Sequence, residues 1–383
     1  MYMTWNEGDI LFKNTNVLID IHNEQYNNNK GMVSTSPDDE FLEWLMVHNV
    51  IEPAEVPLEK KLPKKSSHYN VFPTNMNNSC YIDSVLVALL MRPDPFTEYY
   101  VLNQKMEGAK TATKYIFGDV RSKDASMRRI IQKTVKAITC GIRGEVIMSP
   151  KQITGKVNSL RKLLGACNFH TDIGSHDQQD ASDFLNMLLE VFSMNDHIGA
   201  KHIIVRASND LLSDDVAPSD TVVTTSRVED IGTVIYIDSW TSEDSSATIL
   251  RTHTDEILDD GYVFEDEWYI RKITDIVYVP KNFFIIHIDR TLTGNKNTKP
   301  FELTEFVRIS ETHVLALTAV VLHNGSSLDS GHYITLFKSA GDVWYLYDDM
   351  IKHGPTKLRA IDFDSLASKY NMHSKTMLAF YSQ

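Results

Sequence analysis

The sequence predicts an α+β fold, with a helical first part and a second part built mainly of strands. Between about 81 and 192, apolar residues recur at three- and four-residue steps, as in helices that bury one face. From about 200 onward, short runs rich in β-branched and aromatic residues alternate with acidic, Ser-rich loops, which is typical of strands. These two patterns together give the α+β class.

Helix breakers and apolar runs place the individual elements. The helical part is predicted to break at Pro93, Pro95, Gly141, Gly144 and Pro150. A short strand is predicted at 268–270, and residues 281–290 are apolar on both faces, which indicates a central strand. Further strands are predicted at 314–322, 331–337 and 343–347, in an antiparallel arrangement.

Size, charge and cysteine content narrow the class of protein. The 383 residues, 42% of them hydrophobic, are enough for one large domain or two ordinary ones. No run approaches the roughly 18 apolar residues of a membrane span, and no signal pattern opens the chain. A net charge of -13 disfavours nucleic acid and suits a partner with a basic patch or tail. We therefore expect a globular protein that binds neither nucleic acid nor membrane.

The three cysteines, Cys80, Cys140 and Cys167, are widely spaced and form no C-x-x-C pair. This spacing argues against a disulfide framework and against a zinc site. We expect no metal and an intracellular, reducing compartment, in the cytoplasm, the nucleus or both.

Residues 1–70 are predicted to form an N-terminal extension ahead of a domain that spans 71–383. Ser36 followed by Pro37 and two acidic residues is typical of a helix start, which predicts a helix over 37–48. Prolines and a mixed charged run remove all periodicity between about 52 and 70, which indicates a linker. The sequence leaves open whether this extension binds a partner or lies against the domain.

Cys80 lies where a polar, Asn-rich loop enters an apolar helix. Val85, Leu86 and Leu89 recur at helical spacing behind it, so Cys80 belongs to the first turn. Unpaired backbone N–H groups and the positive end of the helix dipole favour a thiolate there. We interpret Cys80 as a candidate nucleophile, with a buried structural cysteine as the alternative.

A cysteine nucleophile needs a base, and the base needs an acceptor that orients it. His332 opens one predicted strand, and Asp348 follows the next. If the turn between them pairs the two strands as a hairpin, both side chains lie at the same end of the sheet. A lone histidine is usually structural, but three such groups at element ends favour nucleophilic catalysis.

Four motifs follow one another along the chain: Asn75-x-x-x-x-Cys80-Tyr81, Gln178-Gln179-Asp180-Ala181, Gly331-His332-Tyr333 and Trp344-Tyr345-x-Tyr347-Asp348-Asp349. In this order they resemble the motifs of ubiquitin-specific proteases, which are papain-like cysteine deubiquitinases. The resemblance runs from about 70 to 383. It implies a helical thumb packed on an antiparallel palm, with a reduced fingers extension. It also implies hydrolysis of the isopeptide or peptide bond after the C-terminal Gly of ubiquitin, by a monomer without a cofactor.

The resemblance assigns roles to individual residues. It implies that Cys80 is the nucleophile, His332 the general base and acid, and Asp348 the residue that orients His332. Asn75 would donate a hydrogen bond to the oxyanion, and Asp349 would support the site. The residues expected to bind the basic ubiquitin tail are Asp180, Gln179, His323 and Tyr333. From the residues alone, Gln178, Gln179 and Asp180 can equally form a helix-capping cluster.

The chain departs from the family pattern at three positions near the cysteine. Asn77 stands where Gly is usual, and Asn is the non-glycine residue that best tolerates positive φ. Ser79 replaces Thr, and Asp83 replaces Asn, so that a carboxylate is expected to oppose the Cys80 thiolate and slow the enzyme. Because 200–280 holds no C-x-x-C pair, zinc-bearing fingers are expected to be absent or metal-free.

Two alternatives to a deubiquitinase stay open at this point. One is a catalytically weak ubiquitin-binding pseudo-enzyme, although the presence of Asn75, Cys80, His332 and Asp348 argues against it. The other is a protease for a different ubiquitin-like modifier, which would use the same catalytic groups. The expected partner is therefore ubiquitin or a ubiquitin-like modifier, together with its conjugates.

Overall fold

The computed structural model describes most of the chain from residue 70 onward. The described residues are 70–106, 121–166, 179–192, 199–208, 223–257, 262–264, 267–292, 295–310, 312–327, 330–339, 341–351, 354–358 and 361–383. The predicted extension, apart from its last residue, lies outside them, as do its helix over 37–48 and its linker. Gln178 and Cys167 also lie outside. None of the described helices combines the length and apolar character that crossing a membrane requires.

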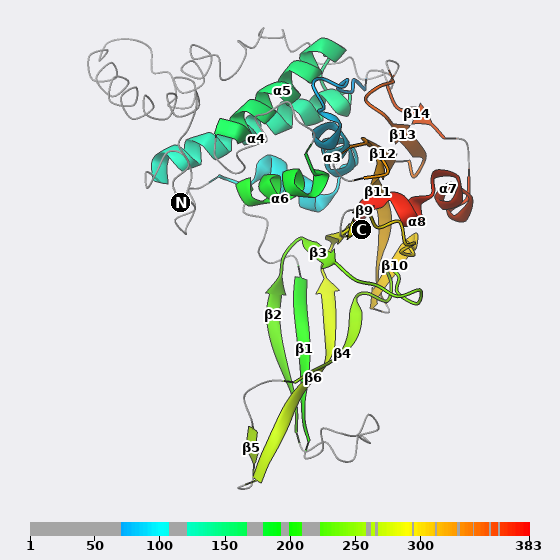
Figure 1. Cartoon of the computed structure of the whole chain (residues 1–383). Helices are drawn as coiled ribbons and strands as arrows, with labels where there is room; N and C mark the ends of the chain where they lie inside the picture. The colour runs from blue at the N-terminus through cyan, green and yellow to red at the C-terminus, as the bar shows by residue number, and fades with distance from the viewer. Residues whose placement is uncertain are drawn as a thin grey trace.

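The helices form one lobe, which we call the thumb (Figure 1). They are α3 (Cys80–Leu90), the π-helix η1 (Thr97–Asn103), α4 (Arg121–Ile142), α5 (Pro150–Ala166) and α6 (Ala181–Val191). α3 ends before Pro93 and α5 begins at Pro150, as the helix breakers predicted. All eleven residues of α3 are buried, because helices cover one side of it and the sheet covers the other. The sequence pattern had predicted only one buried face.

An eight-stranded sheet, the palm, lies against α3. Its strand order is β14-β13-β12-β11-β15-β7-β3, with β10 paired to β11. The strands are β3 (Val234–Ile237), β7 (Phe283–Ile288), β10 (Phe306–Ser310), β11 (His313–Asn324), β12 (His332–Lys338), β13 (Trp344–Tyr347), β14 (Thr356–Lys357) and β15 (Thr376–Ser382). The α+β class is confirmed. The prediction of a wholly antiparallel palm was wrong at one pair, because β3 runs parallel to β7.

The palm separates two apolar cores, and β7 contributes to both. Phe283 and Ile285 belong to the core shared with the thumb, whereas Phe284, Ile286 and Ile288 belong to the core on the opposite face. Successive side chains of a strand point to opposite faces, so a strand between two cores carries apolar residues on both faces. β7 lies between β15 and β3, which explains the apolar run at 283–286 in the sequence.

A second sheet, the fingers, projects from the palm (Figure 1). It comprises β1 (Gly199–Ser208), β2 (Val223–Ile231), β4 (Arg251–Ile257), β5 (Tyr262–Phe264) and β6 (Glu267–Pro280). The short strand predicted at 268–270 is in fact part of the 14-residue β6, which pairs with β1, β4 and β5. The remaining elements are the hairpin β8 (Thr291–Leu292) and β9 (Asn295–Lys296), and the helices α7 (Phe363–Tyr370) and α8 (Met372–Lys375).

Candidate active site

Cys80 is the first residue of α3, and the loop before it has an unusual backbone. Asn77 and Asn78 both adopt left-handed conformations, with φ of 53° and 59°. Asn therefore replaces the usual Gly at 77 without losing the positive φ, as expected. Arg161 of α5 donates to the carbonyl oxygen of Asn77 at 2.8 Å and holds the loop against the thumb. Cys80 itself is only 3% exposed.

His332 and Asp348 meet at one end of the palm. β12 and β13 form an antiparallel hairpin in which Thr335 pairs with Tyr347, so the start of β12 lies beside the end of β13. His332 Nε2 lies 2.8 Å from Asp348 Oδ1. The hairpin predicted from the sequence thus brings these two side chains together. Gly331 is needed before His332 because a Cβ there would lie 2.4 Å from Nε2 of His323.

Electrostatic contacts favour a charged His332. Its pKa is raised to about 9, chiefly by a side-chain hydrogen bond with Cys80, while burial opposes the rise. The hydrogen bond with Asp348 and the charge of Asp349 raise the pKa further. An imidazolium next to a sulfur atom is the arrangement that stabilises a thiolate nucleophile. His332 therefore interacts with both Cys80 and Asp348.

Asp349 connects Asn75 to His332. Asn75 donates its backbone N–H to the Asp349 carbonyl oxygen at 3.0 Å and its Nδ2 to Asp349 Oδ2 at 2.9 Å. The other oxygen, Oδ1, lies 3.5 Å from His332 Nε2. A side-chain amide carries two N–H donors, so Asn75 keeps one for a further acceptor after binding Asp349. Asp349 thus contacts both Asn75 and His332, and its supporting role stays a prediction.

Asp83 is wholly buried one helical turn after Cys80. It accepts a hydrogen bond from Ser79 Oγ at 2.6 Å. Burial, followed by the charge of Asp349, raises the pKa of Asp83 well above its usual range. The neutral acid is thereby favoured, so the structure does not support the expected negative charge opposing the thiolate. The cause is tertiary, because neither the burial nor Asp349 is visible near position 83 in the sequence.

Metal ligation is a second possible use of this cluster. Ligand atoms of His332, Asp348 and Asp349 lie within 4.8 Å of one another, the one such group among the described residues. His332 Nε2 is already engaged by Asp348, which favours an orienting role over a metal site. The expectation that no metal is required stays a prediction.

Of the predicted tail-binding residues, Asp180 and Gln179 open α6. Asp180 is the N-cap of the helix, and its Oδ1 accepts from both the backbone N–H and the hydroxyl of Ser182, each at 2.6 Å. Gln179 is half-buried beside it. The capping alternative is therefore correct for Asp180. Capping does not exclude binding. The charge of Asp180 also acts on the palm, where it raises the pKa of His323 against the effect of burial.

His323 and Tyr333 face each other across β11 and β12, with ring centroids 4.7 Å apart. Both are buried, at 0% and 1% exposure, so neither offers surface to a partner here. Lys296 of β9 lies with Nζ 2.9 Å from His323 Nδ1 and donates to the His323 carbonyl oxygen at 2.6 Å. Burial and the charge of Lys296 lower the pKa of His323 to about 4. Sequence reasoning missed Lys296, since a lysine in a polar loop normally points to solvent.

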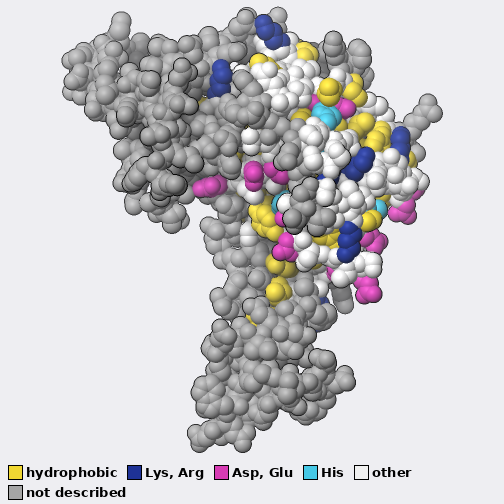
Figure 2. Space-filling view, viewed as in Figure 1, with side chains coloured by type: hydrophobic (Ala, Val, Ile, Leu, Met, Phe, Trp, Pro, Cys, Tyr) yellow, Lys and Arg dark blue, Asp and Glu magenta, His cyan; other side chains and the backbone are white. Residues whose placement is uncertain are grey.

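An acidic surface lies where the thumb meets the palm. Asp183 is in the first turn of α6, beside Asp180. Asp180, Asp289 and Asp183 all act on His287 of β7, whose pKa is lowered by burial against their charges. Figure 2 shows acidic side chains over α6 on this face. Such a surface attracts a basic segment.

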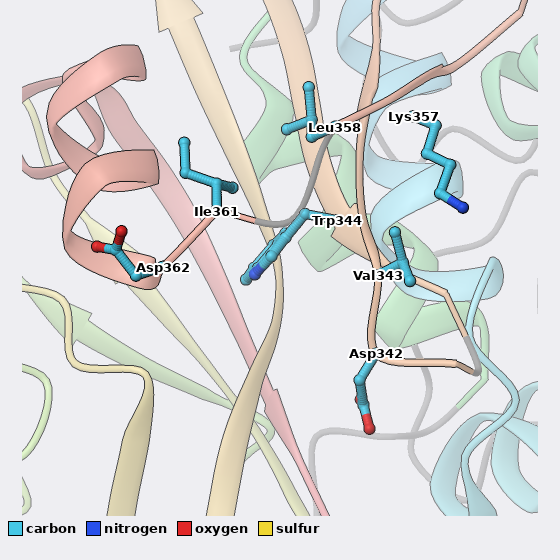
Figure 3. A pocket seen from close by; sticks show the side chains of 7 residues that line it. All are labelled: Asp342, Val343, Trp344, Lys357, Leu358, Ile361 and Asp362. Atoms are coloured by element: carbon cyan, nitrogen blue, oxygen red, sulfur yellow. The ribbon is translucent and has the colours of Figure 1, made fainter.

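A cavity lined by described residues lies away from this site. It has a volume of about 720 Å³ and is lined by Asp342, Val343, Trp344, Lys357, Leu358, Ile361 and Asp362. Figure 3 shows Trp344 between Ile361 and Leu358, while the charged ends of Asp342 and Lys357 point away from it. Trp344 begins β13, whereas Asp348 follows its end. Because no polar groups converge here, the cavity is not the site of the chemistry.

The sequence matches the family model of ubiquitin carboxyl-terminal hydrolases over residues 73–354. This match covers more than half of the chain, so the protein belongs to that family, and its resemblance to ubiquitin-specific proteases is confirmed. No curated protein sequence matches the chain at a significant level.

Solved structures with a similar fold come from deubiquitinating (DUB) modules that contain Ubp8. One is the SAGA Ubp8/Sgf11/Sus1/Sgf73 module bound to ubiquitin aldehyde, with a TM-score of 0.55, 12% identity and coverage of 84% of this chain and 72% of that one. A module bound to monoubiquitin has a TM-score of 0.53 and 13% identity, and the match covers 91% of this chain and 76% of that one. A yeast SAGA module with an Sgf73 mutant has a TM-score of 0.50 and 14% identity, and the match covers 91% of this chain and 75% of that one. At these identities the likeness concerns the fold, which is papain-like as expected.

Proposed function

We propose that the protein is a thiol-dependent deubiquitinase that hydrolyses the isopeptide or peptide bond after the C-terminal Gly of ubiquitin. One observation carries the proposal: His332 lies 2.8 Å from Asp348, and its pKa is raised chiefly by its interaction with Cys80 at the start of α3. Membership of the ubiquitin carboxyl-terminal hydrolase family supplies the substrate class.

In this mechanism Cys80 attacks the carbonyl carbon of the terminal Gly as a thiolate. The resulting oxyanion accepts hydrogen bonds from the second N–H of Asn75 Nδ2 and from backbone N–H groups at the start of α3. His332 then gives its proton to the leaving amine, and a thioester remains on Cys80. Water, deprotonated by His332, attacks the thioester and releases the carboxylate. Asp348 keeps the His332 ring oriented through both steps.

Recognition of ubiquitin would begin with its basic tail. The acidic residues Asp180, Asp183 and Asp289 gather at the junction of thumb and palm, where the tail must pass to reach Cys80. Gln179 would contribute hydrogen bonds from the same helix start. His323 and Tyr333 would line the channel once the tail displaces the residues that cover them. Ubp8, whose fold is similar, has been solved with ubiquitin aldehyde and with monoubiquitin.

The test uses a ubiquitin probe with a thiol-reactive group at its C-terminus and reads the product by intact mass. Wild type should gain one ubiquitin, and Cys80→Ala should gain none. Cys140→Ala is the matched control, because Cys140 is the other free cysteine among the described residues. Burial raises the pKa of Cys140 to about 11, so this variant should react like wild type. An adduct that persists in Cys80→Ala would overturn the assignment of the nucleophile.

The two alternatives differ from the proposal in the same assay. A protease for another modifier would leave the ubiquitin probe untouched and react with the probe built on its own modifier. A pseudo-enzyme would bind ubiquitin yet react with none of the probes. We also propose a monomer working in a reducing compartment, which keeps Cys80 a free thiol. Elution at twice the expected mass in size-exclusion chromatography with light scattering would contradict the monomer.

A further inference from the structure

Two carboxyl groups are buried together behind the candidate active site. Asp83 of α3 is 0% exposed and Asp349, which follows β13, is 3% exposed. One oxygen of each has a donor: Ser79 Oγ at 2.6 Å for Asp83 and Asn75 Nδ2 at 2.9 Å for Asp349. The Oδ1 atoms of both are buried without a hydrogen-bond partner, although His332 Nε2 approaches Asp349 Oδ1 to 3.5 Å. Such orphaned atoms are rare in folded proteins and call for an explanation.

Two carboxylates in contact inside a protein cannot both stay ionised. The charged and titratable groups that act on this pair come from every element around it. They are Arg161 of α5, Tyr81 of α3, Tyr347 of β13, Asp348 after it and His332 of β12. Among the influences on Asp83, Arg161 is weaker than burial and weaker than Asp349. The nearby cations therefore do not neutralise two negative charges.

The surroundings also decide which group holds the proton. Asp349 receives a hydrogen bond from Asn75 and the favourable charge of His332, and both stabilise its carboxylate. Asp83 receives one side-chain donor, Ser79, and its one favourable charge, Arg161, has a weaker influence than Ser79. A proton on Asp83 can be donated to Asp349, which gives both orphaned oxygens a partner. In line with this, the pKa of Asp83 is raised well above its usual range, whereas that of Asp349 rises to about 6.

We propose that Asp83 is a positioning residue that works as a neutral acid: its carboxyl O–H donates to Asp349 and holds that carboxylate between Asn75 and His332. A protonated carboxyl offers one acceptor and one donor, as a side-chain amide does. Asn at 83 could therefore accept from Ser79 and donate to Asp349 in the same way. The consequence for catalysis rests on the proposed function, but the shared proton does not.

The pH profile of kcat/KM, measured for Asp83→Asn and Asp83→Leu, tests whether Asp83 acts as a neutral donor or as a negative charge. The acid limb should report Asp349, whose pKa is about 6. Asn keeps the donor and adds no charge, so that limb should stay in place and turnover near pH 7 should be retained. Leu removes the donor, so the limb should move up by about half a pH unit or more. If Asp83 were ionised, Asn would remove a negative charge and the limb would move down, which would overturn the proposal.

A second measurement does not depend on turnover. Infrared difference spectra of wild type against Asp83→Asn at pH 7 should contain a protonated-carboxyl C=O band in the wild type alone. Asp94→Asn is the matched control, because Asp94 is another buried aspartate whose pKa burial raises. The difference band assigned to Asp83 should remain in the Asp94→Asn background. If this band were absent both from wild type and from the Asp94→Asn background, the shared proton would be refuted, even if the protein cleaved ubiquitin. If the band were present but the protein did not cleave ubiquitin, the proposed function alone would be refuted.

Discussion

The two ends of the β12–β13 hairpin differ in what their side chains do. At one end, His332, Asp348 and Asp349 converge within hydrogen-bonding or ion-pair distance, and the pKa of His332 rises to about 9. At the other end lies a cavity of about 720 Å³ around Trp344, whose charged neighbours diverge (Figure 3). Convergence of titratable groups, rather than empty volume, therefore marks the candidate site.

Substitution at each end tests this comparison most directly. His332→Ala removes the base, so kcat should fall by roughly 10³-fold. Lys357→Ala, an exposed residue that lines the cavity, should leave kcat unchanged. Steady-state cleavage of a fluorogenic ubiquitin substrate measures both variants. A comparable loss in Lys357→Ala would show that the cavity end also takes part in the reaction.

The pH dependence of kcat/KM sharpens the description of the catalytic end. Activity should fall on the acid side near pH 6, as Asp349 takes up a proton, and on the alkaline side near pH 9, as His332 loses one. Asp348→Asn removes an influence that raises the pKa of His332, so the alkaline limb should move to lower pH. It should also lower kcat because the ring loses the carboxylate that fixes its tautomer. An alkaline limb that stays in place would show that Asp348 does not act on His332.

A smaller effect is expected at Lys296, beside the strand pair that leads to His332. Lys296→Met leaves Nδ1 and the carbonyl oxygen of His323 without this donor, which should reduce the free energy of unfolding by about 1–3 kcal/mol. Removing the charge should also raise the pKa of His323 from about 4. Chemical denaturation measures the first change and NMR titration the second. Lys299→Met is the control: Lys299 donates to the Trp240 carbonyl oxygen and does not act on His323.

Much of the site could be predicted because its members lie at the ends of elements that contiguous residues define. The apolar spacing after Cys80 placed it at a helix start, and the Gly341-Asp342 turn placed His332 and Asp348 at one end of a hairpin. Likewise, α3 ends before Pro93 and α5 begins at Pro150, because proline breaks a helix interior but is tolerated in its first turn. The catalytic roles of these residues stay predictions until the probe experiment is done.

Contacts between distant segments decided the rest. The parallel pairing of β3 with β7 and the length of β6 depend on partner strands elsewhere in the chain. The protonation of Asp83 depends on Asp349, 266 positions later, as well as on complete burial. The sequence by itself determined which chemical groups stand at the ends of helices and strands, since periodicity and turn residues are local. Only the tertiary structure determined their charges and hydrogen-bond partners, since desolvation and electrostatic contact act through space between residues far apart in the chain.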